Sequence, residues 1–373
     1  MVARGPGRAR PTRNILHETD MNLLPAIDLH LHIDGAVRTE TILDLAREQG
    51  IALPAATPAE LEAYVRVSPN CSSLTEFLAT FNVFYPLLKS PDALRRISAE
   101  LMEDLDADGV LYAELRFAPA LNLPHDTPPE ATEAGMERVV AAVLEGMRDG
   151  LVRSRGSLIG AGLILCCYRG LALELAHRTV RVATRFSRET GGGEDVRLCG
   201  VDLAGDESRY PAGDFAEVFD FAREHGLRRT VHAGEAAGAR SVRDALDLLH
   251  AERIGHGIRT EEDPALLERV IRDEIPLEIC LSSNLHTATV SGLDRHPLRR
   301  YLDAGARVTI NTDDPRVSGI TLSGEWELAT RQFALGPAEQ RRILQNSVAA
   351  SFAPAELRAR MRERIDEYFA GRA

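Results

Sequence analysis

The sequence is almost devoid of lysine: Lys89 is the only one, and arginine supplies every other positive side-chain charge. It also lacks any apolar run that approaches the roughly 20 residues a membrane-spanning helix requires. Beyond residue 25 there is no low-complexity stretch long enough to separate two domains. We therefore expect no membrane partner and no second domain joined through a linker.

Cysteine spacing typical of disulfides is absent as well. The five cysteines are odd in number, and none forms a C-x-x-C pair. Two of them, Cys166 and Cys167, are adjacent within an apolar run. This usage is typical of small core residues in a reducing compartment. The sequence therefore predicts free thiols and a cytoplasmic protein.

Charge and length limit the partners and the fold. With 373 residues, 44% of them hydrophobic, the chain can bury a large core. Its net charge of −12 makes nucleic acid or an anionic membrane unsuitable as a main partner. The first twenty residues are basic and rich in Gly and Pro, but lack the apolar stretch of an export signal. We expect a disordered basic tail at residues 1–21 and a single domain over 22–373.

Short apolar runs rich in β-formers alternate with helical patterns along the chain. Near-continuous apolar strands separated by helices indicate a parallel sheet covered on both sides. Eight such runs predict a (β/α)₈ TIM barrel, with extra helical patterns after the first strand. A doubly wound sheet is the alternative, but no Gly-rich phosphate turn follows the first run. The runs cover residues 26–34, 110–119, 158–169, 196–207, 228–235, 252–258, 276–284 and 307–315.

The first run, AIDLHLHIDG at residues 26–35, places His30 and His32 two residues apart. Side chains alternate faces along a strand, so both imidazoles point the same way and can reach one metal ion. The alternative is a pair of ordinary half-buried histidines. Polar residues also gather at the ends of the later runs, as expected for the catalytic face of a barrel.

Three imidazoles and one carboxylate, from His30, His32, His232 and Asp313, would suit one catalytic zinc ion with an open position. Lys89 lies in the helical stretch after the first strand, so it cannot readily be the carbamylated lysine that bridges two ions in some barrels. That favours one zinc per chain.

Three further polar residues near these positions have ordinary structural explanations as well. Glu235 follows His232 by three residues and suits a proton shuttle, but acids also favour the first turn of a helix. His256 lies between two glycines and could be a core histidine with a satisfied hydrogen bond. Asp313 and Asp314 precede Pro315 and could be turn residues.

Eight segments together resemble adenosine deaminases, in the same order and at similar spacing, and the resemblance extends from about residue 25 to beyond 350. They are DLHLHIDGAVRTETILDLAREQGIALP, SLTEFLATF, VLYAELRFAP, ILCC, DLAGDE, TVHAGE, RIGHGIRT and NTDDP. The resemblance implies a zinc-dependent (β/α)₈ hydrolase that converts adenosine, and usually 2′-deoxyadenosine, to inosine and ammonia. The chain has no P-C-x-x-C, which the smaller cytidine-type zinc deaminases use.

The resemblance also implies a role for each matching residue. Glu235 resembles the proton donor to purine N1, and His256 the group that orients and helps deprotonate the attacking water. Asp314 resembles the carboxylate that bonds N7, Gly205 the backbone donor to N3, and Asp34 the partner of the ribose 5′-hydroxyl. The apolar lid over the nucleoside is matched by Leu74, Phe77, Leu78 and Phe81, and the implied zinc ligands are His30, His32, His232 and Asp313.

Other functions share these residues. Adenine deaminase and 6-aminodeoxyfutalosine deaminase use the same metal and proton-transfer groups, but relatives of those types usually carry Glu at the position of Asp34. A zinc barrel that has lost activity and serves as a scaffold is a further alternative, although Glu235 and His256 are both retained. One departure from the family is EICLSSN at 278–284, where a Cys-Pro version is usual.

Overall fold

The computed structural model describes residues 23–189 and 195–370. The basic tail predicted for residues 1–21 lies outside the described residues. The boundary placed at residue 22, and the single domain placed after it, stay predictions.

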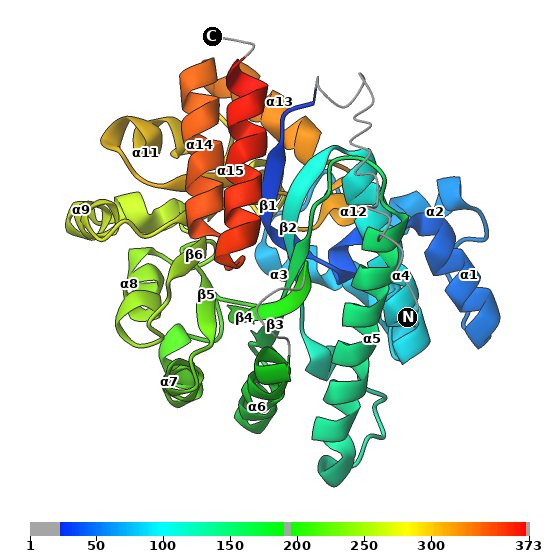
Figure 1. The fold of residues 1–373 in the computed structure, drawn as a ribbon. Coiled ribbons are helices and arrows are strands. Elements are labelled where there is room, and N and C mark those ends of the chain that lie inside the picture. The colour runs from blue at the N-terminus through cyan, green and yellow to red at the C-terminus, as the bar shows by residue number, and fades with distance from the viewer. Residues whose placement is uncertain (1–22, 190–194, 371–373) are drawn as a thin grey trace, which may run out of the picture.

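Eight parallel strands form one sheet in the order of the sequence, from β1 to β8 (Figure 1). The sheet closes where β1 meets the end of β8: the His32 N–H donates to the Asp313 carbonyl, and the Asp313 N–H donates to the His30 carbonyl, both at 2.7 Å. The predicted TIM barrel is therefore confirmed, and the doubly wound alternative was wrong. The strands are β1 (Ala26–His32), β2 (Val110–Phe117), β3 (Ala161–Tyr168), β4 (Val196–Ala204), β5 (Arg228–Ala233), β6 (Arg253–His256), β7 (Leu277–Ile279) and β8 (Val308–Ile310).

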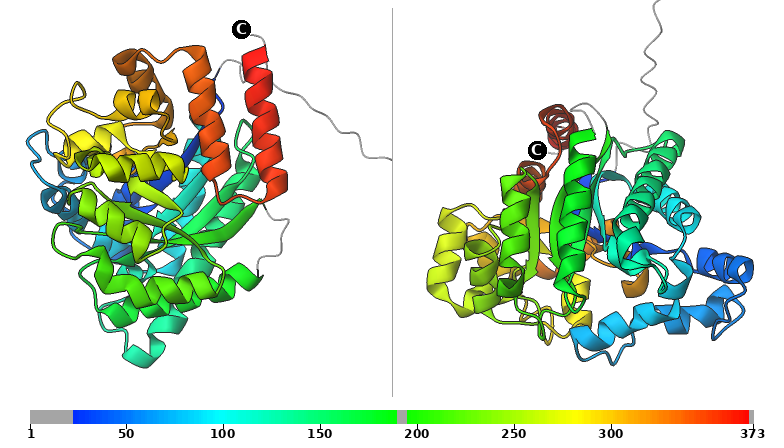
Figure 2. Two further views of the ribbon diagram at one scale, coloured as in Figure 1. Left: turned by 90° about the vertical axis from the view of Figure 1, so that its left-hand side faces the viewer. Right: turned by 90° about the horizontal axis from the view of Figure 1, so that it is seen from below.

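Four α-helices lie between β1 and β2, as expected: α1 (Thr39–Gln49), α2 (Pro58–Val65), α3 (Leu74–Ala79) and α4 (Pro91–Ala107). The views in Figures 1 and 2 show helices around the strands, with the last two helices side by side. None of the described helices is both long and apolar enough to cross a bilayer. The others are α5 (Thr132–Arg153), α6 (Leu173–Glu189), α7 (Ala216–Glu224), α8 (Ala239–Asp247), α9 (Pro264–Arg272), α10 (Leu281–His286), α11 (Leu298–Ala304), α12 (Pro315–Ser318), α13 (Leu322–Phe333), α14 (Pro337–Ala350) and α15 (Ala355–Ala370).

Local sequence explains where these helices begin and which face they bury. Asp263 caps α9 by accepting hydrogen bonds from the backbone N–H groups of Ala265 and Leu266, and a proline occupies the first turn. Leu266 and Val270, one turn apart, are the buried residues of this helix. The amphipathic pattern in the sequence therefore predicted α9 correctly.

Several predicted runs are longer than the strands they contain: the run at 307–315, for example, is a strand only over Val308–Ile310. Two segments differ further from the prediction. The run at 276–284 is a strand only as far as Ile279, because the chain turns into α10 at Leu281. The side chains of Ser282, Ser283 and Asn284 bond to residues far away in the sequence, and these contacts override the strand pattern. The i, i+3, i+4, i+7 spacing of the lid residues Leu74, Phe77, Leu78 and Phe81 predicts one helix face. In the structure α3 ends at Ala79, and Thr80–Val83 forms a 3₁₀ turn.

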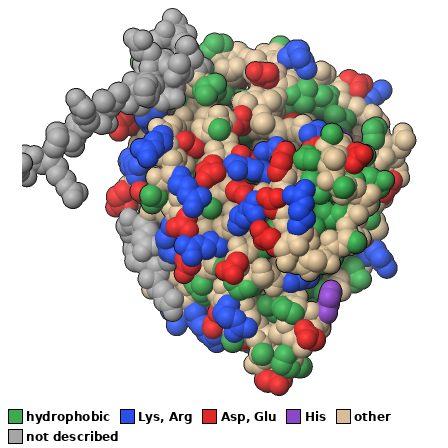
Figure 3. Space-filling view, turned by 90° about the vertical axis from the view of Figure 1, so that its right-hand side faces the viewer, with side chains coloured by type: hydrophobic (Ala, Val, Ile, Leu, Met, Phe, Trp, Pro, Cys, Tyr) green, Lys and Arg blue, Asp and Glu red, His purple; other side chains and the backbone are tan. Residues whose placement is uncertain are grey.

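Charged side chains of both signs alternate on the face that carries α1, α2, α4 and α5 (Figure 3). Between α4 and α5, Arg95 pairs with Glu145 and Asp149, and Arg38 pairs with Asp104 nearby. Arg95 and Arg38 therefore each lie beside acidic side chains.

Candidate active site

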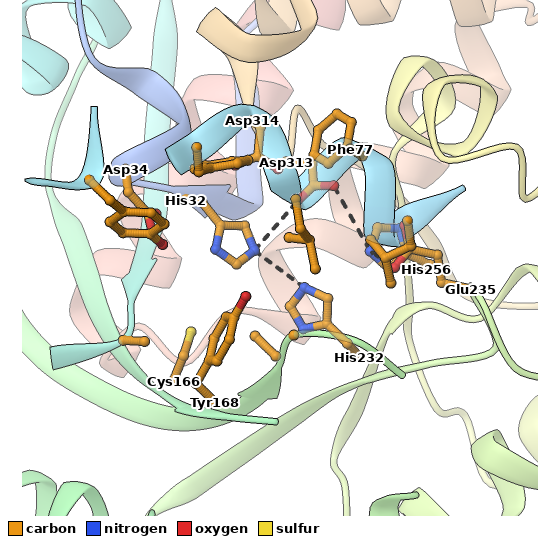
Figure 4. Close-up of a pocket in the computed structure, with 17 residues that line it drawn as sticks. His32, Asp34, Phe77, Cys166, Tyr168, His232, Glu235, His256, Asp313 and Asp314 are labelled. Carbon is orange, nitrogen blue, oxygen red and sulfur yellow. Dashed lines mark hydrogen bonds and ion pairs between the residues drawn. The ribbon is translucent and has the colours of Figure 1, made fainter. Parts of the chain in front are cut away.

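Both histidines of β1 point to the inside of the barrel, as strand alternation predicts. His30 Nε2 lies 3.0 Å from His232 Nε2, and His32 Nε2 lies 3.2 Å from the same atom. His232 comes from the end of β5, and Asp313 from the residues after β8. Asp313 Oδ1 is 3.2 Å from His30 Nε2 and 3.4 Å from His32 Nε2. The ends of three strands, β1, β5 and β8, thus bring three imidazole nitrogens and one carboxylate oxygen to one point. His32, His232 and Asp313 of this cluster are labelled in Figure 4.

His256, from the end of β6, belongs to the same cluster. One donor atom each from His30, His232, His256 and Asp313 lie within 4.8 Å of one another, so these four residues could hold a metal ion. His256 and Asp313 also share a backbone feature, with positive φ angles of 61° and 68°. Such angles cost a non-glycine residue about 1–3 kcal/mol and concentrate at functional sites.

Buried carboxylates orient two of the histidines from behind. His30 Nδ1 donates to Glu278 at 2.8 Å, and His232 Nδ1 donates to Asp202 at 2.9 Å. Arg116 joins the two carboxylates, at 3.0 Å from Glu278 and 2.9 Å from Asp202. A ring that donates through Nδ1 presents a bare Nε2, which is the form a metal ion requires.

Electrostatics keep these two carboxylates charged. Burial alone would raise the pKa of Asp202, but His232 and Arg116 hold it well below its usual range. Burial opposes ionisation of Glu278 too, yet Arg116 and Arg253 keep its pKa well below normal. Both side chains therefore accept the imidazole N–H bonds as anions.

Glu235 lies beside His256, with Oε2 at 3.6 Å from His256 Nε2. Burial, and then the negative charges of Asp313 and Glu207, raise the pKa of Glu235 to about 8. A carboxyl group in this state holds a proton at neutral pH and can donate it.

The loop that carries Glu235 is held by the carboxylate of Glu207. Glu207 accepts hydrogen bonds from the backbone N–H groups of Gly234, Glu235, Ala236 and Ala237, at 2.6–3.0 Å. Four converging amide donors suit only an anionic acceptor. Glu207 therefore holds the backbone of Glu235, and with it the Glu235 Cα and Cβ atoms, in one position.

Replacing Glu207 with Gln should lower kcat/KM for deamination on the order of 10²-fold, because an amide donor then faces the four N–H groups and the loop shifts. Glu339→Gln is the matched control, since Glu339 accepts the Gly336 N–H at the start of α14, away from the pocket. We expect near-normal turnover from the control. Equal activity of both variants in steady-state assays would contradict the positioning of the loop by Glu207.

Asp34 and Asp314 line the same pocket, and each has one carboxylate oxygen without a hydrogen-bond partner among the described residues. Burial raises the pKa of both groups, and the charge of Asp313 raises the pKa of Asp314 further, well above its usual range. The Asp314 carboxyl group packs directly against the backbone of Gly35. Only glycine allows this contact, because a Cβ at residue 35 would lie 1.8 Å from Asp314 Oδ1. Two pocket-lining residues, each with a buried and unsatisfied carboxyl oxygen, are suited to polar groups of a ligand.

The pocket has an apolar cover. The described residues that line the pocket include all the predicted lid residues. They also include Gly205, the residue that follows β4. In Figure 4, Asp34 lies on one side of His32 and Asp313, and Glu235 with His256 on the other. The lid residues are Leu74, Phe77, Leu78 and Phe81.

Sequence reasoning missed several residues of this site. Tyr85 donates to Asp34 Oδ2, and Tyr168, Cys166 and Ala118 line the pocket. Lys89, which we expected not to be a metal-bridging lysine, donates to the Leu121 carbonyl and is not among the residues that line the pocket. Other residues missed were the supports Asp202, Glu207, Glu278 and Asn284. An acid within a buried strand is a signal that could have found Asp202 and Glu278, because buried charges need partners.

The adenosine deaminase family model matches residues 25–368 of the chain. The chain belongs to the adenosine deaminase family. A family relative from Haemophilus ducreyi, an adenosine deaminase, is 40% identical over 329 residues, which are 87% of this chain and 91% of the relative. The chain is therefore a hydrolytic deaminase, and the inactive scaffold is not supported.

Solved structures of similar fold include several deaminases. Adenine deaminase from Arthrobacter aurescens superposes with a TM-score of 0.78 at 28% identity, covering 93% of this chain and 99% of that one. A Zn-bound amidohydrolase from Burkholderia ambifaria gives 0.79 at 26%, covering 97% and 95%. Arabidopsis ADAL in complex with IMP gives 0.79 at 27%, covering 96% and 100%. Small purine-like ligands thus occur in this group of structures.

Proposed function

We propose that the protein removes the 6-amino group of adenosine, and of 2′-deoxyadenosine, to give inosine and ammonia. The observation that carries this proposal is the placement of Glu235, Asp314 and Asp34 around the histidine cluster. A protonated acid, a second carboxyl with a raised pKa and a carboxylate with a free oxygen face one cavity. These groups suit the N1, N7 and 5′-hydroxyl positions of a purine nucleoside.

One zinc ion per chain would be held by His30, His32, His232 and Asp313. The donor set fits, because nitrogen and oxygen donors converge and carboxylates fix two of the rings with Nε2 bare. When bound, such an ion makes water nucleophilic at neutral pH. The Zn-bound neighbour supports the choice of metal.

The side chains around the cluster then divide the remaining work. Glu235 gives its proton to N1, which makes C6 electrophilic, and His256 orients the attacking water. The water oxygen bonds to C6, one water proton passes to the departing nitrogen and the other returns to Glu235, and the C6–N bond breaks to release ammonia. Asp314, protonated because of its raised pKa, donates to N7, and the Gly205 N–H donates to N3.

The charge of the pocket favours a nucleoside over a nucleotide. The described side chains that line it include no lysine or arginine, and a 5′-phosphate requires such cations. The Asp34 carboxylate would repel a phosphate placed beside it. The nucleotide-bound neighbour is therefore a guide to fold and purine binding, and AMP is not the proposed substrate. Adenine and 6-aminodeoxyfutalosine remain the alternative substrates.

Replacing Asp34 with Ala should lower kcat/KM for adenosine about 10–150-fold, because a hydrogen bond to a charged group contributes roughly 1.5–3 kcal/mol. The activity with 5′-deoxyadenosine, which lacks the hydroxyl, should change much less. Tyr85→Phe is the control, because it removes the protein partner of Asp34 and leaves the carboxylate. Steady-state kinetics with the two nucleosides test this. Equal losses would mean that Asp34 only supports its neighbours.

A further inference from the structure

A line of buried polar side chains leads from the pocket to the backbone of α11. The Leu298 N–H donates to His296 Nδ1 at 3.1 Å. His296 Nε2 lies 3.3 Å from Asn284 Oδ1, and Asn284 Nδ2 lies 3.1 Å from His256 Nδ1. The three side chains are each at most 2% exposed, so no bulk solvent competes for these bonds.

The direction of every bond in this line follows from its first donor. A backbone N–H can only donate, so His296 Nδ1 accepts, bears no proton, and leaves the ring neutral with its proton on Nε2. That N–H donates to the oxygen of Asn284, which turns the amide NH₂ toward His256. His256 Nδ1 must then accept, and its single proton lies on Nε2. Burial, which lowers the pKa of His296 to about 3, agrees with a neutral ring there.

We propose that Asn284 and His296 are positioning residues that hold His256 in the Nε2–H form, so that His256 donates a hydrogen bond into the pocket and does not bind the metal ion. The inference rests on the proposed function for the role of His256, but the tautomer itself follows from the hydrogen bonds alone.

The same logic separates His256 from its neighbours in the cluster. His30 and His232 donate through Nδ1 to carboxylates and therefore present a bare Nε2. His256 has an amide donor behind it, so its Nε2 presents a hydrogen atom. That Nε2 has no hydrogen-bond partner among the described residues, and lies 3.6 Å from Glu235 Oε2 and 4.0 Å from Asp313 Oδ2. An oxygen atom placed between these groups would accept its N–H.

Nuclear magnetic resonance of the zinc-loaded protein labelled with ¹⁵N-histidine tests the tautomer directly. Long-range ¹H–¹⁵N correlations distinguish a protonated from a bare ring nitrogen, and loss of signals in His256→Gln assigns the ring. We expect a bare Nδ1 and a protonated Nε2 in His256. A proton on Nδ1 of the unmodified protein would overturn the proposal.

Asn284→Asp tests the consequence, because aspartate has the shape of asparagine but can only accept. The proton of His256 should appear on Nδ1, kcat should fall about 10–100-fold, and KM and zinc content should stay within about two-fold. Asn346→Asp, the same exchange at a half-buried site where the amide donates to the Val308 carbonyl, should change neither. Unchanged His256 protonation and kcat in Asn284→Asp would contradict the proposal.

A second pair of variants works through His296. Gln keeps an N–H donor near the place of Nε2, so His296→Gln should retain the His256 pattern and most of kcat. His296→Leu removes the donor and should give mixed tautomers and a lower kcat. Identical spectra and kcat in both would overturn the role of His296. Because the spectra need no substrate, a protein that shows the expected pattern but fails to deaminate adenosine would contradict only the proposed function.

Discussion

His232→Ala is expected to abolish both metal binding and deamination. His232 Nε2 is central to the cluster, at 3.0 Å from His30 Nε2 and 3.2 Å from His32 Nε2, and Asp202 fixes its ring. Changes to groups that only orient a ligand cost about 10–100-fold in metal affinity or activity, so losing the ligand should cost more than about 10²-fold. Elemental analysis after dialysis and steady-state kinetics measure the two losses.

His225→Ala is the matched control for this experiment, because His225 is an exposed histidine stacked on Phe221 and lies in the turn after α7. It should keep about one zinc ion per chain and normal turnover. Full zinc content in His232→Ala, or two tightly bound ions in the unmodified protein, would contradict the mononuclear site. Full activity after chelation would do the same.

Glu235→Gln is expected to reduce turnover by about 10²–10⁴-fold, because the amide keeps the shape of the acid but cannot give up a proton in the same way. Zinc content should stay near that of the unmodified protein, since Glu235 is not a proposed ligand. Single-turnover and steady-state rates with adenosine measure the effect.

Glu325→Gln provides the control for replacing a buried acid. Burial raises the pKa of Glu325 to about 7, and its carboxylate accepts from Ser282, but it does not line the active-site pocket. Its variant should turn over within a few-fold of normal. A normal rate in Glu235→Gln would show that N1 is protonated by another group.

The barrel could be predicted from the sequence because its signals are local. Each strand is a short apolar run, and a polar residue such as His30 or His256 stands near its end. The strand end after residue 279 could not be predicted, because Ser283 and Asn284 are placed by Asp313 and His256, which pair with them only in three dimensions. Local pattern carries no information on such contacts.

The same limit applies to the site. His30 and His32 could be paired from strand alternation, and Asp313 from its place at a strand end. Glu207 could not be assigned to the Glu235 loop, because an acid in a sequence does not reveal which backbone amides it accepts from. The resemblance to a family supplied the roles that we propose for the pocket residues, whereas the structure shows which neighbours hold those residues in position.

Substrate preference tests the central claim most directly. The purified zinc-loaded protein should be assayed by ultraviolet absorbance and ammonia release with adenosine, 2′-deoxyadenosine, adenine, AMP and 6-aminodeoxyfutalosine. The account predicts the highest kcat/KM with adenosine and 2′-deoxyadenosine, with one ammonia released per nucleoside deaminated. It predicts much lower kcat/KM for adenine, which has no hydroxyl group to pair with Asp34, and for AMP, whose phosphate Asp34 repels. A preference for adenine, AMP or 6-aminodeoxyfutalosine, or no turnover of adenosine, would contradict it.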